Sequence, residues 1–285
     1  SPSLMYEELR KAYDTTADRI WLLNVGDIKS CEASMNLFLA MAYDIDSFDY
    51  NNISLYQARW LANIFGDKYY NDFVDITNTF YHQAFSRKPE FMGWGYQWAT
   101  NRHGKERNTD TDFSFANYRE ADLRLAAYER IGAKVGEILG ELPEEYKPGF
   151  YQLLYYPVKG CELINKMVLT GQKNRWYVLQ QRAAANKLKE QAKVYYDSLQ
   201  TITQGYNSLL NGKWEHVMTT RQGFAASYFE LPQLRTVELS DIPSLGIWVE
   251  EEDVLKGKAS FHLLPVFSTY LRQSYYFDVF NKGEG

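Results

Sequence analysis

Most of the chain carries the spacing of amphipathic helices, in which apolar residues recur every three or four positions. Residues 116–139 show it best, through Ala121, Leu125, Tyr128, Ile131, Val135 and Ile138. The same spacing predicts helices over 54–65, 69–86, 148–168 and 174–210. Five helices joined mostly by short turns predict an antiparallel bundle.

Two local signals refine this bundle. Ser54 and Gln57 have the spacing of a capping box, in which each side chain bonds an amide at the start of a helix. Pro157 lies inside the fourth helix, where its missing N–H predicts a kink.

A different pattern precedes the bundle. After a short amphipathic helix over 4–13, Arg19 to Asn24 form a mostly apolar run, long enough for a buried strand and too short for a helix. A polar turn to Asp27 and a helix over 33–43 complete one βα unit. Side chains just past such a strand face the ligand cleft of an α/β fold. The alternative is that Asn24 and Asp27 only form the turn and cap the helix.

Beyond Gly212 the helical spacing ends. Residues 245–249 and 275–280 are rich in aromatic and β-branched side chains and are expected to be strands. The expected fold is therefore mainly α: an antiparallel five-helix bundle flanked by one N-terminal βα unit and a few C-terminal β-strands. The expected domains are a βα unit over 1–50, the bundle over 51–213, and a linker with the start of a β-rich domain over 214–285.

Composition narrows the function. The net charge of −5 and the pI near 5.5 argue against nucleic acid as a partner, because an electrostatic binder needs clustered positive charge. No apolar run approaches the roughly 20 residues of a membrane span, so no membrane partner is expected. Only two cysteines occur, which excludes a disulfide scaffold, and they have no metal-type spacing.

The sequence lacks the motifs that several kinds of catalytic chemistry need. A di-iron bundle needs Glu-x-x-His pairs, but Thr79, Thr100, Lys213 and Ala259 stand three residues before the four histidines. The sequence also has no Walker loop, dinucleotide glycine pattern, nucleophile elbow or His-Glu-x-x-His motif. No metal and no cofactor are expected.

The stretch 87–113 has neither helical nor alternating spacing and is longer than an ordinary connection. It is rich in aromatic residues, and Arg102 and Arg107 belong to a cationic second half that could meet a carboxylate. The alternative is a loop packed by its aromatic side chains, with its charges in solvent.

The stretch WLLNVGDIKSCEASMNLFLAMAYD resembles the last strand and helix of the catalytic barrel in glycoside hydrolase family 115. The family pattern is an apolar strand, Asn-Val-Gly-Asp, a Lys two residues on, and then a Glu. This sequence supplies Asn24, Val25, Gly26, Asp27, Lys29 and Glu32. The resemblance continues through RKPE, NYREADLR, FYQLLYYPVKG and YNSLLNGKWEHVM to LGIWVEE and YYFDVFNKG, which resemble the opening of the family's β-sandwich region. It breaks at Arg221 to Phe224, where the family has a His-Gly-Tyr-like stretch.

The resemblance implies an α-glucuronidase that removes glucuronic acid or its 4-O-methyl form from xylan with inversion and without a cofactor. The partner would be glucuronoxylan or a related acidic polysaccharide. The resemblance also implies a periplasmic or secreted protein that forms a homodimer through the helical bundle. In such a dimer the long loop would reach the neighbouring subunit's sugar cleft, where Arg102 or Arg107 would pair with the glucuronate.

The same resemblance gives roles to four residues. Asn24 and Asp27 would lie at the mouth of the barrel in substrate-binding positions. Lys29 would neutralise the uronate, and Glu32 would orient it or merely start the helix. A barrel needs eight strands and this chain supplies one, so the general acid and base are expected outside it, and the chain alone is expected to be inactive. The rival hypothesis is a helical interaction or dimerisation module with no catalytic activity.

Overall fold

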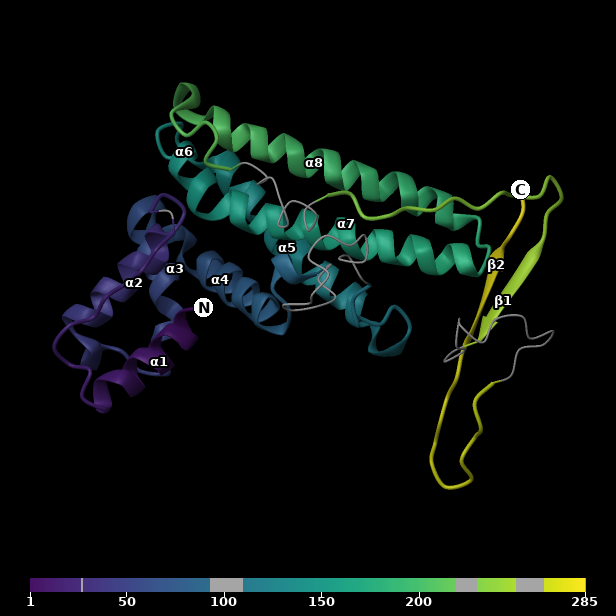
Figure 1. Ribbon diagram of the computed structural model, residues 1–285, viewed down its shortest axis with the longest axis horizontal. Coiled ribbons are helices and arrows are strands. Elements are labelled where there is room, and N and C mark those ends of the chain that lie inside the picture. Colours follow the sequence, from purple (N-terminus) through teal and green to yellow (C-terminus); the bar gives the residue numbers. More distant parts are fainter. Residues whose placement is uncertain (27, 93–109, 219–229, 250–263, 285) are drawn as a thin grey trace, which may run out of the picture. The chain divides into compact units, whose positions relative to one another are not determined.

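A computed structural model describes residues 1–26, 28–92, 110–218, 230–249 and 264–284. The described chain is mainly helical and ends in a small antiparallel sheet, so the expected mainly α fold is confirmed (Figure 1). The α-helices in order are α1 (Pro2–Asp14), α2 (Glu32–Tyr43), α3 (Tyr56–Phe65), α4 (Tyr70–Ser86), α5 (Glu120–Glu141), α6 (Lys147–Phe150), α7 (Tyr156–Leu179) and α8 (Ala184–Gly212). None of these helices is long and apolar enough to cross a membrane.

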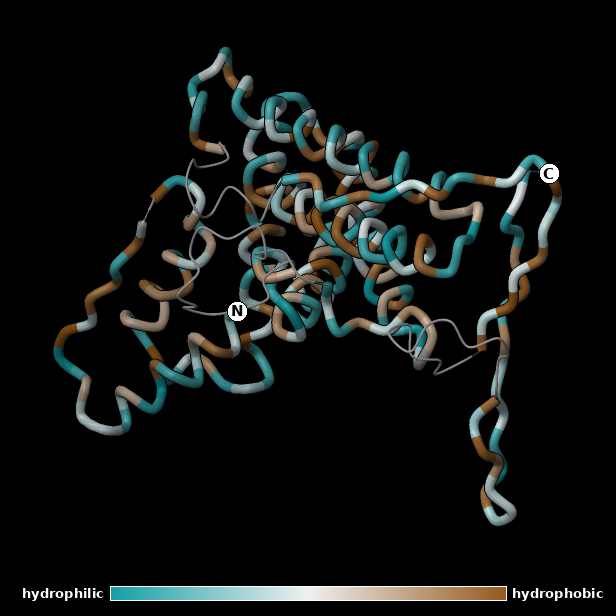
Figure 2. The backbone as a smooth tube through the Cα atoms, turned by 45° about the vertical axis from the view of Figure 1, so that its right-hand side comes forward, coloured by the Kyte–Doolittle hydropathy of each residue, from teal (hydrophilic) through white to brown (hydrophobic). Residues whose placement is uncertain are grey.

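The chain forms two compact units. Unit 1 contains residues 1–89, 124–162 and 200–219, and unit 2 contains residues 90–123, 163–199 and 220–285. Helices α5, α7 and α8 have residues in both units. Along the helices, apolar and polar positions alternate as the sequence spacing predicts (Figure 2).

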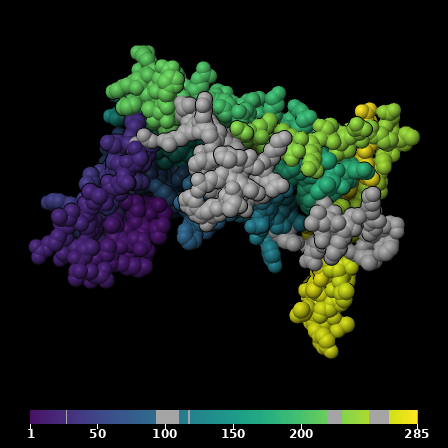
Figure 3. Space-filling view, in the orientation of Figure 1, coloured from purple at the N-terminus to yellow at the C-terminus, as the bar shows by residue number. Residues whose placement is uncertain are grey.

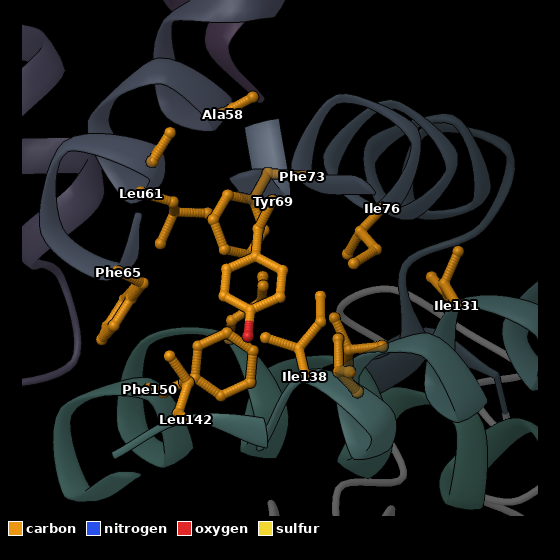
Figure 4. Packing of buried hydrophobic residues seen from close by; sticks show 14 of the residues in the cluster. Ala58, Leu61, Phe65, Tyr69, Phe73, Ile76, Ile131, Ile138, Leu142 and Phe150 are labelled. Atoms are coloured by element: carbon orange, nitrogen blue, oxygen red, sulfur yellow. The ribbon is translucent and has the colours of Figure 1, made fainter. Parts of the chain in front are cut away.

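The core of unit 1 is formed by the apolar stripes of α3, α4, α5, α6 and the start of α7 (Figure 4). Phe73 and Phe150 are fully buried, and Phe65 meets Phe150 edge-on with ring centroids 5.2 Å apart. Each such buried side chain stabilises the fold by about 1.5–3 kcal/mol. A second cluster joins α1 to α2 through Tyr6, Leu37 and Met41.

The predicted capping box does not form. Residues Ile53–Leu55 make a 3-10 turn, and α3 then begins at Tyr56 without a side-chain cap. Gln57 instead accepts a hydrogen bond from the Tyr81 hydroxyl, with 2.6 Å between the oxygens.

The interruption predicted at Pro157 is present, but its form is a π-helical turn. Residues Tyr151–Tyr155 form that turn directly between α6 and α7. Proline has no N–H to donate to the carbonyl four residues earlier, and its ring clashes with that carbonyl. The wider π-helical turn accommodates both effects.

The predicted boundary between the fourth and fifth helices is wrong. Helix α7 continues through Gly171 to Leu179, and the chain then turns at Gln181, whose φ is 56°. Gln181 and Arg182 donate to the carbonyls of Val178 and Tyr177, which is the hydrogen-bond pattern of a Schellman cap. The cap carries Gln where glycine is usual, so no helix stop signal marks this position in the sequence.

The strand predicted from Arg19 to Asn24 does not form in the described chain. Trp21 packs beside the α1–α2 cluster, while Ile20 and Leu22 are 85% and 90% exposed. A strand needs a neighbour to pair with its backbone, and no described strand pairs with these residues. Their place in a barrel stays a prediction.

Unit 2 contains the two strands, β1 (Leu245–Val249) and β2 (Phe277–Asn281), which pair with Ile247 opposite Val279. Both strands fall close to the predicted ranges. Arg182 ties β2 to the α7–α8 turn, since its guanidinium lies 2.7 Å from Asp278 and 4.1 Å from the centre of the Phe280 ring. Many side chains between residues 264 and 284 are exposed at the surface (Figure 3).

The side chains of α7 and α8 hold an extended segment of unit 2. Asn174 bonds both the amide and the carbonyl of Arg235, at 2.8 and 3.0 Å. Asn186 bonds both groups of Val237 in the same way, at 2.9 and 3.0 Å. Two amide side chains thus pair with the segment as a neighbouring strand would.

Candidate functional site

Three of the six predicted site residues lie in the described chain. Asn24 is exposed, and Lys29 and Glu32 are each partly buried. Asp27, Arg102 and Arg107 lie outside the described residues, so their predicted roles stay predictions.

Lys29 and Glu32 are brought together by the start of α2. Glu32 is the first residue of that helix, where a carboxylate interacts favourably with the helix dipole. The Cys31 amide donates to the Ile28 carbonyl, which closes the turn before the helix. The Lys29 Nζ then lies 2.5 Å from the Glu32 Oε1, with 25% and 28% of the two side chains exposed. The helix-starting role considered for Glu32 is therefore present, together with an ion pair.

A third member of the cluster is Trp214. The Lys29 Nζ lies 4.8 Å from the centre of the Trp214 indole ring, within the range of a cation–π interaction. Lys213 also lies over this ring, at 5.1 Å. Trp214 follows the end of α8, far along the sequence from Lys29.

The backbone before Trp214 takes an unusual path. Leu210 and Asn211 have φ values of 53° and 59°, followed by Gly212 at 78°. Side chains other than glycine rarely adopt this left-handed conformation, which costs about 1–2 kcal/mol per residue. Asn207 holds the resulting turn, because its amide group donates to the Met218 carbonyl at 2.6 Å and accepts from the Met218 amide at 3.1 Å.

Tyr206 lies buried beside this cluster, with 1% of its surface exposed. Burial, with smaller contributions from the negative charge of Glu32 and from the nearby Tyr156, raises the pKa of the Tyr206 hydroxyl to about 12. The ring centroids of Tyr156 and Tyr206 are 5.0 Å apart, and the Tyr156 hydroxyl is hydrogen-bonded to Thr203 at 3.1 Å. The Tyr206 hydroxyl is therefore neutral at ordinary pH, and the negative charge of Glu32 favours that neutral form.

A cavity of about 140 Å³ opens beside the first turn of α2. Tyr81 donates to Gln57 in its wall, and burial raises the pKa of the Tyr81 hydroxyl to about 12. The cavity is lined by Ser30, Ala33, Ser34, Gln57, Thr77, Phe80, Tyr81, Leu153, Leu154, Pro157 and Val158. None of the three described site residues, Asn24, Lys29 and Glu32, lines it.

Chemically, the cluster suits the binding of an anion. An ammonium group has three N–H donors, and Lys29 uses one of them on Glu32. Among the described residues the cluster contains one carboxylate, whereas glycoside hydrolysis needs two flanking the bond. As described, the cluster can therefore hold a charged group of a ligand and lacks the pair of carboxyl groups that hydrolysis needs.

Comparison with known proteins identifies the segment that carries Lys29 and Glu32. Residues 1–91 match the family model described as glycosyl hydrolase family 115. These residues are similar to that family. The resemblance drawn from the Asn24–Glu32 motif is thus confirmed.

A solved family 115 enzyme resembles most of the chain. It is described as a GH115 4-O-methyl-α-glucuronidase, BtGH115A, with specificity for decorated arabinogalactans. The sequences are 29% identical, the TM-score is 0.68, and the match covers 84% of this chain. It covers 30% of the solved chain, so the present chain spans less than a third of that relative. No curated protein matches the chain.

Sequence reasoning found Lys29 and Glu32 through the family motif but missed Trp214. The KWEHVM stretch was recognised only as part of the resemblance, and the hydropathy around it is unremarkable for the end of a helix. The one local hint was Gly212, which is a common residue just after a helix. Nothing in the sequence places the indole against Lys29.

Proposed function

We propose that this chain is the C-terminal part of an α-glucuronidase, which removes glucuronic acid or its 4-O-methyl form from an acidic polysaccharide with inversion. The observation that carries the proposal is the likeness to BtGH115A over 84% of this chain. The partly buried ammonium of Lys29 supports it, because a uronate carries the carboxylate that such a group would bind.

The contribution of this chain would be binding and support. Inverting glycosidases place two carboxyl groups about 6.5–9.5 Å apart, and Glu32 is the one carboxylate paired with Lys29 among the residues that the structure describes. We therefore propose that the acid and base come from barrel strands outside residues 1–285. Residues 1–50 would be the last βα unit of the barrel, 51–213 its helical bundle, and 214–285 the link to a β-rich domain.

Two polysaccharides are candidates for the substrate. Family resemblance suggested glucuronoxylan, and the description of BtGH115A names decorated arabinogalactans. Both carry their uronic acid on side chains, so the same Lys29 site serves either. We propose the acidic side chain as the substrate class and a periplasmic or secreted enzyme, since polymers of this size are met outside the cytoplasm.

The test compares the complete enzyme with the isolated chain on both polysaccharides. The complete enzyme should release glucuronic acid or its 4-O-methyl form, and nuclear magnetic resonance should show the inverted anomer first. The chain of 285 residues should release none. Turnover by the isolated chain would show that the catalytic groups lie within it. Release of neutral sugars alone by the complete enzyme would refute the substrate class.

A homodimer through the bundle belongs to the same proposal. In that dimer Arg102 or Arg107 would cross to the partner's sugar cleft and bind the glucuronate with a planar pair of hydrogen bonds. Arg102→Ala and Arg107→Ala should each be compared in the complete enzyme on glucuronate and on a neutral-sugar analogue. The arginine that contacts the carboxylate should show a selective loss on glucuronate of about 1.5–3 kcal/mol. Equal activity on both substrates in both variants would remove the loop from the site.

A further inference from the structure

Lys29 is held by two partners that act on its charge in different ways. Glu32 offsets the positive charge of the ammonium at 2.5 Å. The Trp214 ring attracts the same ammonium at 4.8 Å through its quadrupole and carries no net charge. Because the ring fixes the ammonium without neutralising it, Lys29 keeps N–H donors and positive charge that can bind a ligand anion in addition to Glu32.

The placement of Trp214 is unfavourable for folding in two respects. Its indole N–H is buried and has no hydrogen-bond acceptor in the part of the chain that the structure describes. The turn that delivers it passes through the left-handed residues Leu210 and Asn211 and is fastened by Asn207. Strained backbone and unsatisfied donors that persist in a structure are concentrated at functional sites.

We infer that Trp214 is a positioning residue for uronate binding, because its indole face holds the Lys29 ammonium where the carboxylate of the sugar is recognised. The inference rests on the proposed function. Without the ring, the Lys29 side chain would regain rotamer freedom, and Glu32 would be its remaining described partner. The site would then bind uronates more weakly, while the chemistry at the glycosidic bond would be unaffected.

The experiment uses the complete enzyme and three replacements, Trp214→Phe, Trp214→Leu and Lys29→Met. The KM for a glucuronate-bearing oligosaccharide should rise from Trp to Phe to Leu, because indole binds cations better than phenyl and an aliphatic chain does not. The rise for Trp214→Leu should be roughly 3- to 30-fold, with kcat nearly constant. Lys213→Ala, which removes the exposed cation on the same ring, serves as the control and should leave KM unchanged.

Two further readouts separate positioning from general damage. In a Lys29→Met background, Trp214→Leu should add little to KM, since both changes act on one interaction. The dissociation constant of free glucuronate should rise in Trp214→Leu, and that of glucose should not. Trp214→Phe should be at least as stable as the wild type, because it removes the buried N–H that lacks an acceptor.

Each result decides the matter. If Trp214→Leu fails to fold, the comparison of Trp with Phe remains, and an unchanged KM in Trp214→Phe overturns the inference. An undiminished effect of Trp214→Leu in the Lys29→Met background, or an equal loss for glucose, overturns it as well. If the wild-type enzyme acts on uronates while the variants keep its KM, only the inference falls. If the wild type has no action on uronates, the proposed function falls and takes the inference with it.

Discussion

Gly132 in α5 lies against a buried carboxylate, which makes it a sharp test of the packing in unit 1. A Cβ added there would lie 1.8 Å from the Glu162 Oε2 and 2.9 Å from its Cδ. Glu162 is 2% exposed and pairs with Lys159 at 2.6 Å. The carboxylate cannot swing into solvent to make room, so Gly132→Ala must displace it from this partner.

The magnitude follows from three contributions. Overpacking a full core costs about 1–3 kcal/mol. A weakened hydrogen bond to a charged group costs about 1.5–3 kcal/mol. Alanine in place of glycine in a helix stabilises the helix by about 1 kcal/mol, which offsets part of these costs. Gly132→Ala should therefore lower the free energy of unfolding by about 1.5–5 kcal/mol.

Gly136, one turn further along α5, is the matched control. It is exposed, and a Cβ there would have no neighbour within 4 Å. Gly136→Ala should raise the free energy of unfolding by about 0.5–1 kcal/mol in the same urea titrations followed by circular dichroism. Glu162→Asp, which draws the carboxylate back by one methylene, should recover part of the loss when combined with Gly132→Ala. Equal stability of the two alanine variants would refute the packing described for Glu162.

Three further predictions concern other parts of the molecule. Because the folded-state pKa values of Tyr81 and Tyr206 are raised from 10 to about 12, the stability that their burial contributes is complete below pH 10. It should be lost as pH rises from 10 through 12, measured as the free energy of unfolding against pH. Replacing Arg182 by Met should destabilise β2 by about 1–3 kcal/mol, because Asp278 loses its partner, and proteolysis should cut β2 first. Hydrogen exchange should be slow in α3, α4 and α5 and fast in residues 19–24, whose backbone has no strand partner.

These three predictions have distinct contrary results. A flat profile between pH 10 and 12 would mean that the tyrosines reach solvent. Unchanged proteolysis after Arg182→Met would mean that β2 is held by the sheet alone. Slow exchange in 19–24 would mean that this segment pairs with a strand that the described chain does not show.

The helices were predictable because their apolar spacing is long and regular. Residues such as Ile131, Val135 and Ile138 form one stripe, and every one of them is buried. Such a pattern depends on many positions at once, so single exceptions do not hide it. The strand at 245–249 was found for a similar reason, since its aromatic and β-branched residues fit a pleated surface.

The parts that escaped prediction depend on partners distant in sequence. Gln181 takes a glycine-type conformation, and neither its identity nor its neighbours reveal it. The contact between Lys29 and Trp214 joins two turns that no local pattern relates. The run from Arg19 to Asn24 has the composition of a strand, but a strand exists only beside another. The family resemblance identified Lys29 as a candidate site residue, because it compares whole motifs. It did not reveal the contact of Lys29 with Trp214.

The pairing of Asn174 and Asn186 with the segment around Arg235 and Val237 has a consequence for how this sequence can vary. Both amides bond the main chain, so the side chains at 235 and 237 are not what is recognised. Substitutions at the exposed Arg235 should therefore be tolerated better than at the buried Val237, and deleting one residue would shift every backbone group past its amide. At 174 and 186 the reverse applies, since aspartate cannot donate and glutamine is one methylene too long. The extended segment must therefore keep its length, and positions 174 and 186 must keep asparagine.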